Sequence, residues 1–232
     1  MMRADASIDR SFHLVMMIAI SAIVLYGFSN TITADVIHPD WRPPRILYIH
    51  VLAYTTWLLV LVSQTVLIWT RNRLLHRKLG WFGAAFALAL VAIGLVTTVS
   101  MGRAHVQRMG PEAGFFIYRP LWDLICFTAA FALAIRWRKR PDIHGRLMVL
   151  AACALTPPAI SRIPGVHGLG TVLLGSDLLV GAAILRDLVT LRRVHDVYCW
   201  GLGLGIAGQT ALLLVMSRHP APFAAFAHYV TQ

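Results

Sequence analysis

Histidines near the starts of apolar segments are the residues of this sequence best suited to chemistry. Three of them, His76, His144 and His195, follow a basic cluster and precede such a segment, and His50 lies one turn into an earlier one. Two neutral imidazoles from different helices that face each other across a gap are typical axial ligands of a b-type haem. We expect His76 and His144 to form an inner pair of haem or metal ligands, and His50 to be the best ligand near the outer side. Alternatively, a histidine beside arginine at a helix end caps backbone groups or contacts lipid headgroups.

Carboxylates inside apolar segments are a second candidate site. Asp177 lies well inside one such segment and Asp123 lies just inside another. An ionised carboxylate is costly at that depth unless it faces the bundle and finds a partner or a proton. We expect Asp177 to pair with Arg162 beside Pro157–Pro158, and these residues with Asp123 to form an outward-facing pocket for a ligand or a proton. A buried ion pair that fixes the helix register is the alternative.

A third and weaker pattern is a row of soft ligands. Met101, His105 and Met109 recur every fourth residue, so a helix would place them on one face suited to Cu(I). Gly102 and Gly110 weaken that helix.

The elements that must position these residues are transmembrane helices. The chain has 232 residues, of which 58% are hydrophobic and only 13% charged, and its mean hydropathy is +0.67. A soluble domain has about twice that share of charged residues. We therefore predict an all-α integral membrane bundle of about seven transmembrane helices in one domain, residues 1–232. The expected spans are about 12–31, 46–70, 80–101, 120–136, 146–160, 169–186 and 197–216, and residues 217–232 are expected to form an interfacial tail.

The basic residues indicate an orientation rather than a nucleic-acid partner. The net charge is +11, but the lysines and arginines lie in short segments between apolar runs. About two thirds of them lie on the side of the N-terminus, which the positive-inside rule makes cytoplasmic. We expect a bacterial-type inner (plasma) membrane protein with its N-terminus inside and its C-terminus outside. We expect the lipid bilayer, and no nucleic acid, as its partner.

The basic cluster and histidine at the start of the third, fifth and seventh spans indicate an internal repeat. Such a repeat predicts stacked helical hairpins to which the first span is added. The fifth span is the weakest, because Pro157–Pro158 interrupts it, and a break at bilayer depth must be covered by protein or line a cavity.

Several of these residues also carry a resemblance. These residues are His50, Trp57 and Gln64, followed by the segments His76-Arg-Lys-Leu-Gly80, His144-Gly-Arg-Leu-Met148 and Ala159-Ile-Ser-Arg162. Through them, residues 46–200 resemble a family of uncharacterised bacterial multi-pass inner-membrane proteins. This resemblance implies the multi-pass fold and adds no activity. The helix-opening histidines are also distantly similar to those of transmembrane di-haem cytochromes b, but they lie at shallower positions than the axial ligands of that family.

Three classes of function remain open. The first is a b-type haem protein, either redox-active or haem-handling. The second is a small-molecule or proton transporter or sensor that uses Asp123, Arg162 and Asp177. The third is a non-catalytic accessory or assembly subunit that packs against other membrane-protein subunits. The sequence has no nucleophile elbow, Walker loop or H-E-x-x-H motif, which favours a protein that is not an enzyme.

Overall fold

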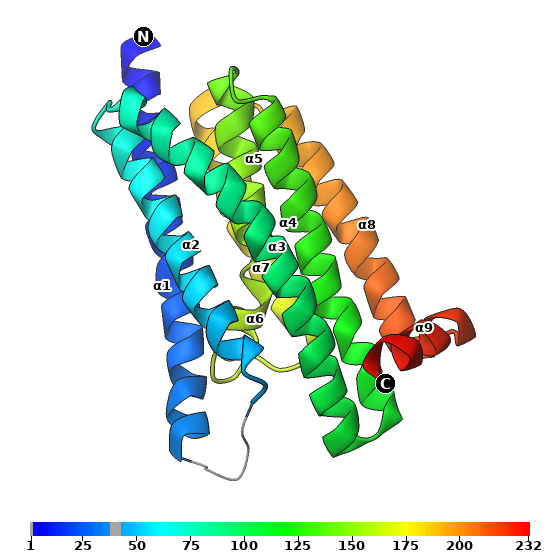
Figure 1. Cartoon of the computed structure of the whole chain (residues 1–232). Helices are drawn as coiled ribbons and strands as arrows, with labels where there is room; N and C mark the ends of the chain where they lie inside the picture. The colour runs from blue at the N-terminus through cyan, green and yellow to red at the C-terminus, as the bar shows by residue number, and fades with distance from the viewer. Residues whose placement is uncertain (1, 38–42) are drawn as a thin grey trace.

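The computed structural model describes residues 2–37 and 43–232, and all regular structure in these residues is helical. The helices are α1 (Met2–Ile37), α2 (Ile46–Trp69), α3 (Arg73–Met109), the 3-10 helix η1 (Pro111–Ile117), α4 (Tyr118–Arg136), α5 (Pro141–Ala154), α6 (Pro157–Ile160), α7 (Leu169–Leu191), α8 (Asp196–Arg218) and α9 (Ala221–Thr231). Figure 1 shows the long helices side by side in a bundle, with α9 lying across one end. We name the two ends of the bundle the His144 end, where α3 and α5 begin, and the Arg119 end, where α4 and α7 begin.

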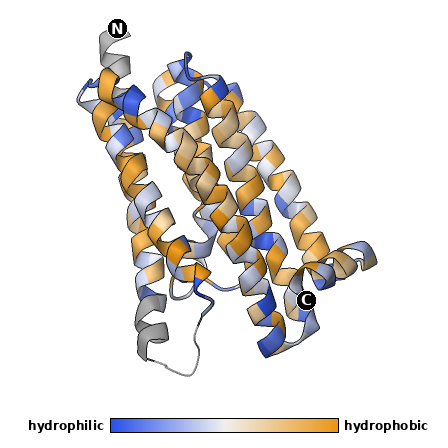
Figure 2. Cartoon of the chain, in the orientation of Figure 1, coloured by the Kyte–Doolittle hydropathy of each residue, from blue (hydrophilic) through white to orange (hydrophobic). Residues whose placement is uncertain are grey.

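The long helices have the length and composition of membrane spans. Six helical segments in the described residues are long and apolar enough to cross a membrane: 10–31, 46–69, 73–109, 111–136, 141–160 and 196–218. Figure 2 shows hydrophobic residues along the middle of these helices and hydrophilic residues gathered towards their ends. The chain is therefore a multi-pass membrane protein. The predicted span 169–186 is a helix, α7, but it is not one of these six.

Local sequence signals explain where the two histidine-bearing helices begin. The side chain of Asn72 accepts a hydrogen bond from the backbone N–H of Leu75 at 3.1 Å, which caps α3. Pro141 occupies the first turn of α5, where the missing N–H leaves no hydrogen bond unmade. These caps place His76 and His144 in the first turns of their helices.

The predicted break near Pro157–Pro158 is confirmed. α5 ends at Ala154 and the single turn α6 begins at Pro157, because a proline inside a helix removes a donor and clashes with the preceding turn. The side chain of Thr156, which is fully buried, donates to the carbonyl of Cys153 at 2.7 Å. A helix interruption in an apolar bundle is thus covered by protein.

The centre of the bundle is closed by aromatic packing between α2 and α4. Trp57, only 2% exposed, meets Phe127 and Phe131 edge-on with ring centroids 5.7 and 5.5 Å apart. Of the predicted hairpins, α2 with α3 and α4 with α5 make the most extensive contacts, whereas α7 touches α8 less. Two of the three predicted hairpins are therefore extensively packed, and the internal repeat itself stays a prediction.

The predicted tail contains a helix that packs on the protein. α9 contacts η1 and the end of α3 at the Arg119 end. The hydroxyl of Tyr118 donates to the carbonyl of Phe223 at 2.6 Å, and Ala227 and Thr231 are buried. This docking fixes one face of the tail, while Tyr229 remains 80% exposed.

Candidate functional site

The predicted inner histidine pair is brought together at the His144 end. His76 from α3 and His144 from α5 have ring centroids 6.5 Å apart and nearly perpendicular planes, at 83°. The Nδ1 of His144 is 2.9 Å from the carbonyl oxygen of Ala134 in α4. The Nδ1 of His76 is buried and has no hydrogen-bond partner among the described residues. His144 is thus oriented by a backbone oxygen, and both rings keep a nitrogen for another ligand.

A third imidazole, that of His13 in α1, lies at the same place. A Cβ atom added to Gly145 would be 2.7 Å from the Nε2 of His13, so this ring lies directly over the backbone next to His144. His13 is not among the residues that sequence reasoning selected as ligands. Glycine directly after the helix-opening histidine is the signal that indicates this close approach.

A buried charge network lies beside the histidines and was also missed. Arg146 of α5 donates from Nε and Nη2 to the carboxylate of Asp187 in α7, with both bonds 2.8 Å long. The Nη1 of Arg186 donates to the same carboxylate at 2.8 Å. The side chains of Arg146 and Asp187 are only 6% and 1% exposed. Arg146 and Arg186 stand at the ends of two predicted spans, and the structure places both within helices, α5 and α7.

His195, the third helix-opening histidine, has a different position. Its Nδ1 accepts a hydrogen bond from the backbone N–H of Val197 at 3.2 Å, which caps the N-terminus of α8. Its Nε2 is 3.8 Å from a carboxylate oxygen of Asp142. The capping alternative given for these histidines therefore fits His195.

A polar cluster forms at the Arg119 end, around His50 and Asp123. The ring of His50 stacks on Tyr54, with centroids 4.1 Å apart, and the buried Nδ1 of His50 has no hydrogen-bond partner among residues 2–37 and 43–232. The Tyr54 hydroxyl donates to the carbonyl of Leu90 at 3.3 Å and lies within electrostatic range of Asp123. Asp123 is 5% exposed and its Oδ2 has no hydrogen-bond partner in the described residues. His50 and the His76–His144 pair are therefore at opposite ends of the bundle.

Two arginines fasten this cluster to the helix break. Arg119 donates from Nη2 to the carbonyl of Pro157 at 2.9 Å and interacts electrostatically with Asp123. Arg162 donates to the carbonyl of Pro158, and its guanidinium lies 4.6 Å from the ring centre of Phe28. The helix break at Pro157–Pro158 thus leaves two backbone carbonyl oxygens free to accept hydrogen bonds from Arg119 and Arg162.

The predicted Asp177–Arg162 pair is wrong. Asp177 of α7 accepts a hydrogen bond from the Nε2 of Gln209 in α8, at 2.9 Å, and forms no salt bridge with Arg162. Asp177 lies about two turns from the start of α7, deeper in the bundle than Arg162. The amide of Gln209 provides a nearby neutral partner, so Asp177 needs no cation to satisfy one of its oxygens.

The row of soft ligands shares one helix face as predicted. α3 continues to Met109, so Met101, His105 and Met109 lie one above another. The ring of His105 is 6.0 Å from that of Phe116, and Met109 is 60% exposed. Among the described residues, no group of three or more His, Cys, Asp or Glu side chains is placed to hold a metal ion.

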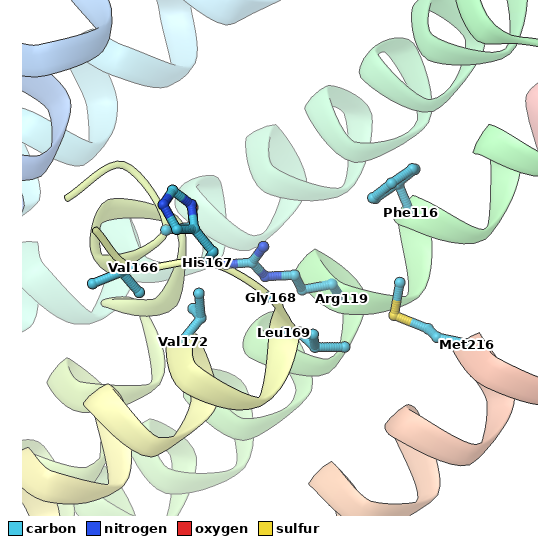
Figure 3. A pocket seen from close by; sticks show the side chains of 9 residues that line it. Phe116, Arg119, Val166, His167, Gly168, Leu169, Val172 and Met216 are labelled. Atoms are coloured by element: carbon cyan, nitrogen blue, oxygen red, sulfur yellow. The ribbon is translucent and has the colours of Figure 1, made fainter. Parts of the chain in front are cut away.

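A pocket of about 340 Å³ opens beside the cluster of the Arg119 end, between α4, α7 and α8. Its lining residues are Phe116, Arg119, Ser161, Val166, His167, Gly168, Leu169, Val172 and Met216. Figure 3 shows Arg119 reaching from α4 towards the segment that carries His167, with Met216 on the opposite side. The pocket contains neither Asp123, Arg162 nor Asp177, so it differs from the predicted one.

Comparison of the chain with protein-family models, with curated proteins and with solved structures finds no match.

Proposed function

We propose that this multi-pass membrane protein binds a b-type haem at the His144 end, where His76 and His144 would hold the iron, and acts in electron transfer or haem handling. The observation that carries the proposal is the separation of the two rings. A metal–nitrogen bond is about 2 Å long, so two imidazoles that would hold one metal ion between them must lie within a few ångströms of each other. The observed centroid separation is 6.5 Å.

The surroundings of the pair also suit ligation. A metal-bound histidine usually donates its other ring N–H to a carbonyl or carboxylate, which fixes the ring. Ala134 provides that carbonyl for His144. The two ligands come from different helices, as a group held between helices requires. When bound, the haem iron would supply one-electron chemistry. The chain itself would orient the imidazoles and keep the buried face away from water.

An absorption spectrum tests this proposal. The protein is purified in detergent from cells supplied with a haem precursor, and spectra are taken oxidised and after dithionite reduction. We expect a six-coordinate b-type spectrum that is lost in both His76→Ala and His144→Ala. His195→Ala is the matched control, because His195 caps α8, and its spectrum should be unchanged. A folded, colourless protein would rule out haem binding.

The Asp123 cluster supports a second candidate, proton or small-molecule transport or sensing. The specific observation in its favour is a buried carboxylate oxygen that has no hydrogen-bond partner in the part of the chain that the structure describes. Purified protein in liposomes that contain a pH-sensitive dye would test it. We expect proton flux in the wild-type protein and its loss in Asp123→Asn, whereas Asp177→Asn, whose carboxylate has Gln209 as a partner, keeps most of the flux. Equal flux in empty liposomes would contradict this candidate.

The cell membrane concerned, the orientation and the accessory-subunit alternative stay predictions. The bacterial inner membrane and a cytoplasmic N-terminus follow only from the distribution of lysine and arginine. Cysteine accessibility in intact cells, measured with a cysteine placed at exposed Lys139 and another at exposed Glu112, would determine which end faces the cytoplasm. Co-purification from mild detergent would reveal a partner subunit.

A further inference from the structure

The pocket between α4, α7 and α8 combines a cationic side with apolar walls. Arg119, Ser161 and His167 supply the polar side. The remaining walls are mainly hydrophobic, with Phe116 on η1, Val172 on α7 and Met216 on α8. A ligand that fits both halves has an acidic group at one end and hydrocarbon at the other.

The guanidinium of Arg119 has donors to spare for an oxyanion. Of its five N–H groups, one is used by the carbonyl of Pro157, and this is its single hydrogen bond within the described residues. That bond holds the side chain in place, and the planar fork matches phosphate oxygens. The side chain of His167 lies near Arg119 on the same side of the pocket, as Figure 3 shows, and can provide a further N–H.

The charges at this end favour an anion over a cation. Arg162 follows α6 and Arg218 ends α8, two residues beyond Met216. Asp123 is the acidic group that acts on Arg119, but it lies about one turn deeper in α4 and is buried. It therefore orients Arg119 and partly offsets its charge without lining the pocket.

The helix surfaces next to the pocket are apolar and exposed, as lipid-facing surfaces are. The apolar stretch of α8 is almost entirely unburied, and Leu213 and Leu214, just before the pocket, are 39% and 46% exposed. On α7 the residues that follow the pocket, Leu174 and Leu178, are 56% and 64% exposed. Hydrocarbon chains of the bilayer would cover both surfaces, so a lipid reaches the pocket by lateral diffusion.

We propose that this pocket binds an anionic phospholipid of the bilayer. The phosphodiester lies at Arg119 and His167, and the upper part of one acyl chain packs against Phe116, Val172 and Met216. Basic residues at the membrane surface attract anionic headgroups, and a pocket adds shape selection to that attraction. This inference does not depend on haem binding at the opposite end.

Thermal unfolding of detergent-purified protein tests the proposal. The added probes are phosphatidylglycerol, phosphatidylcholine with the same acyl chains, and oleate. We expect phosphatidylglycerol to raise Tm by about 4 °C, and the other two to raise it by less than about 1 °C. In Arg119→Gln this shift should vanish, with an affinity at least roughly tenfold lower. Lys139→Gln, which removes an exposed cation at the opposite, His144 end, is the matched control and should keep the full shift.

A second variant keeps the test decisive if Arg119→Gln folds poorly. Met216→Trp fills the apolar half of the pocket and leaves Arg119 untouched, so it should also abolish the shift. An equal shift with phosphatidylcholine would overturn the proposal, because the acidic headgroup would then be irrelevant. An equal shift with oleate would overturn the assignment to a phospholipid. Retention of the shift in both Arg119→Gln and Met216→Trp would place lipid binding elsewhere.

Discussion

Arg146 and Asp187 join α5 to α7 inside the bundle through two parallel hydrogen bonds, each 2.8 Å long. Both side chains are almost fully buried, and the guanidinium of Arg146 also lies 5.9 Å from the ring centre of Tyr198. A bidentate arginine–carboxylate pair is directional as well as strong. It therefore holds α7 at one height relative to α5, next to the histidine pair.

We predict that Asp187→Ala is among the most destabilising substitutions in this protein. It leaves Arg146 and Arg186 facing each other without their shared carboxylate, and breaking a buried pair costs about 3–5 kcal/mol. Unfolding in detergent monitored by circular dichroism would measure the loss. Asp142→Ala is the control, because its pair with Arg140 is exposed and worth at most about 1 kcal/mol. Equal losses in the two variants would contradict the importance of the buried pair.

Gly27→Ala should weaken the contact of α1 with the helix break. A Cβ atom at Gly27 would overlap the carbonyl oxygen of Ala159 and lie 2.8 Å from its carbonyl carbon. Because that obstacle is backbone, α1 or α6 must move, and overpacking of this kind costs about 1–3 kcal/mol. Thermal unfolding would show a lower Tm.

Gly181→Ala is the matched control for that substitution. Gly181 is also within a helix, but a Cβ atom there would meet nothing within 4 Å. Alanine is favoured over glycine in a helix by up to about 1 kcal/mol, so this variant should be unchanged or more stable. A drop in Tm equal to that of Gly27→Ala would show that the loss does not come from the Ala159 contact.

Asp177 should be energetically coupled to Gln209 and independent of Arg162. In a double-mutant cycle with alanine, we expect Asp177 and Gln209 to show a coupling of about 1–2 kcal/mol, because they share a hydrogen bond. Asp177→Ala and Arg162→Ala should be additive within about 0.5 kcal/mol. Both cycles are measured by the same unfolding assay. Strong coupling between Asp177 and Arg162 would contradict the structure and support the ion pair predicted from the sequence.

Asn72→Ala should destabilise the start of α3, where His76 lies. The loss of the bond to the Leu75 N–H costs about 1 kcal/mol in typical N-caps. Asn72→Ser retains a capping oxygen and should recover most of the lost Tm. If Asn72→Ser is no more stable than Asn72→Ala, the cap does not determine where this helix begins.

The sequence alone determined the class of protein and most of the helices. Apolar runs about 20 residues long indicate helices that cross a membrane, so the helical segments could be predicted from the sequence. The break at Pro157–Pro158 and the positions of His76 and His144 at the starts of helices could also be predicted from nearby residues. These features depend on periodicity, proline and capping residues, all of which act within one element. Each of the seven predicted spans is helical apart from the break between α5 and α6 in the fifth, and six of them meet the criteria of length and composition.

Tertiary structure decided which polar groups meet. The position of Asp177 along the bundle would allow a pair with either Arg162 or Gln209. The rotation of α7 against α8 places the carboxylate next to Gln209. Arg146 stands at the start of a predicted span, and only the tertiary structure buries it, because Asp187 faces it from α7. His13 joins the histidine pair because Gly145 admits its ring. Such partners depend on how helices are rotated and crossed. Rotation and crossing are set by the packing of all side chains together, so no single segment of the chain specifies the partner.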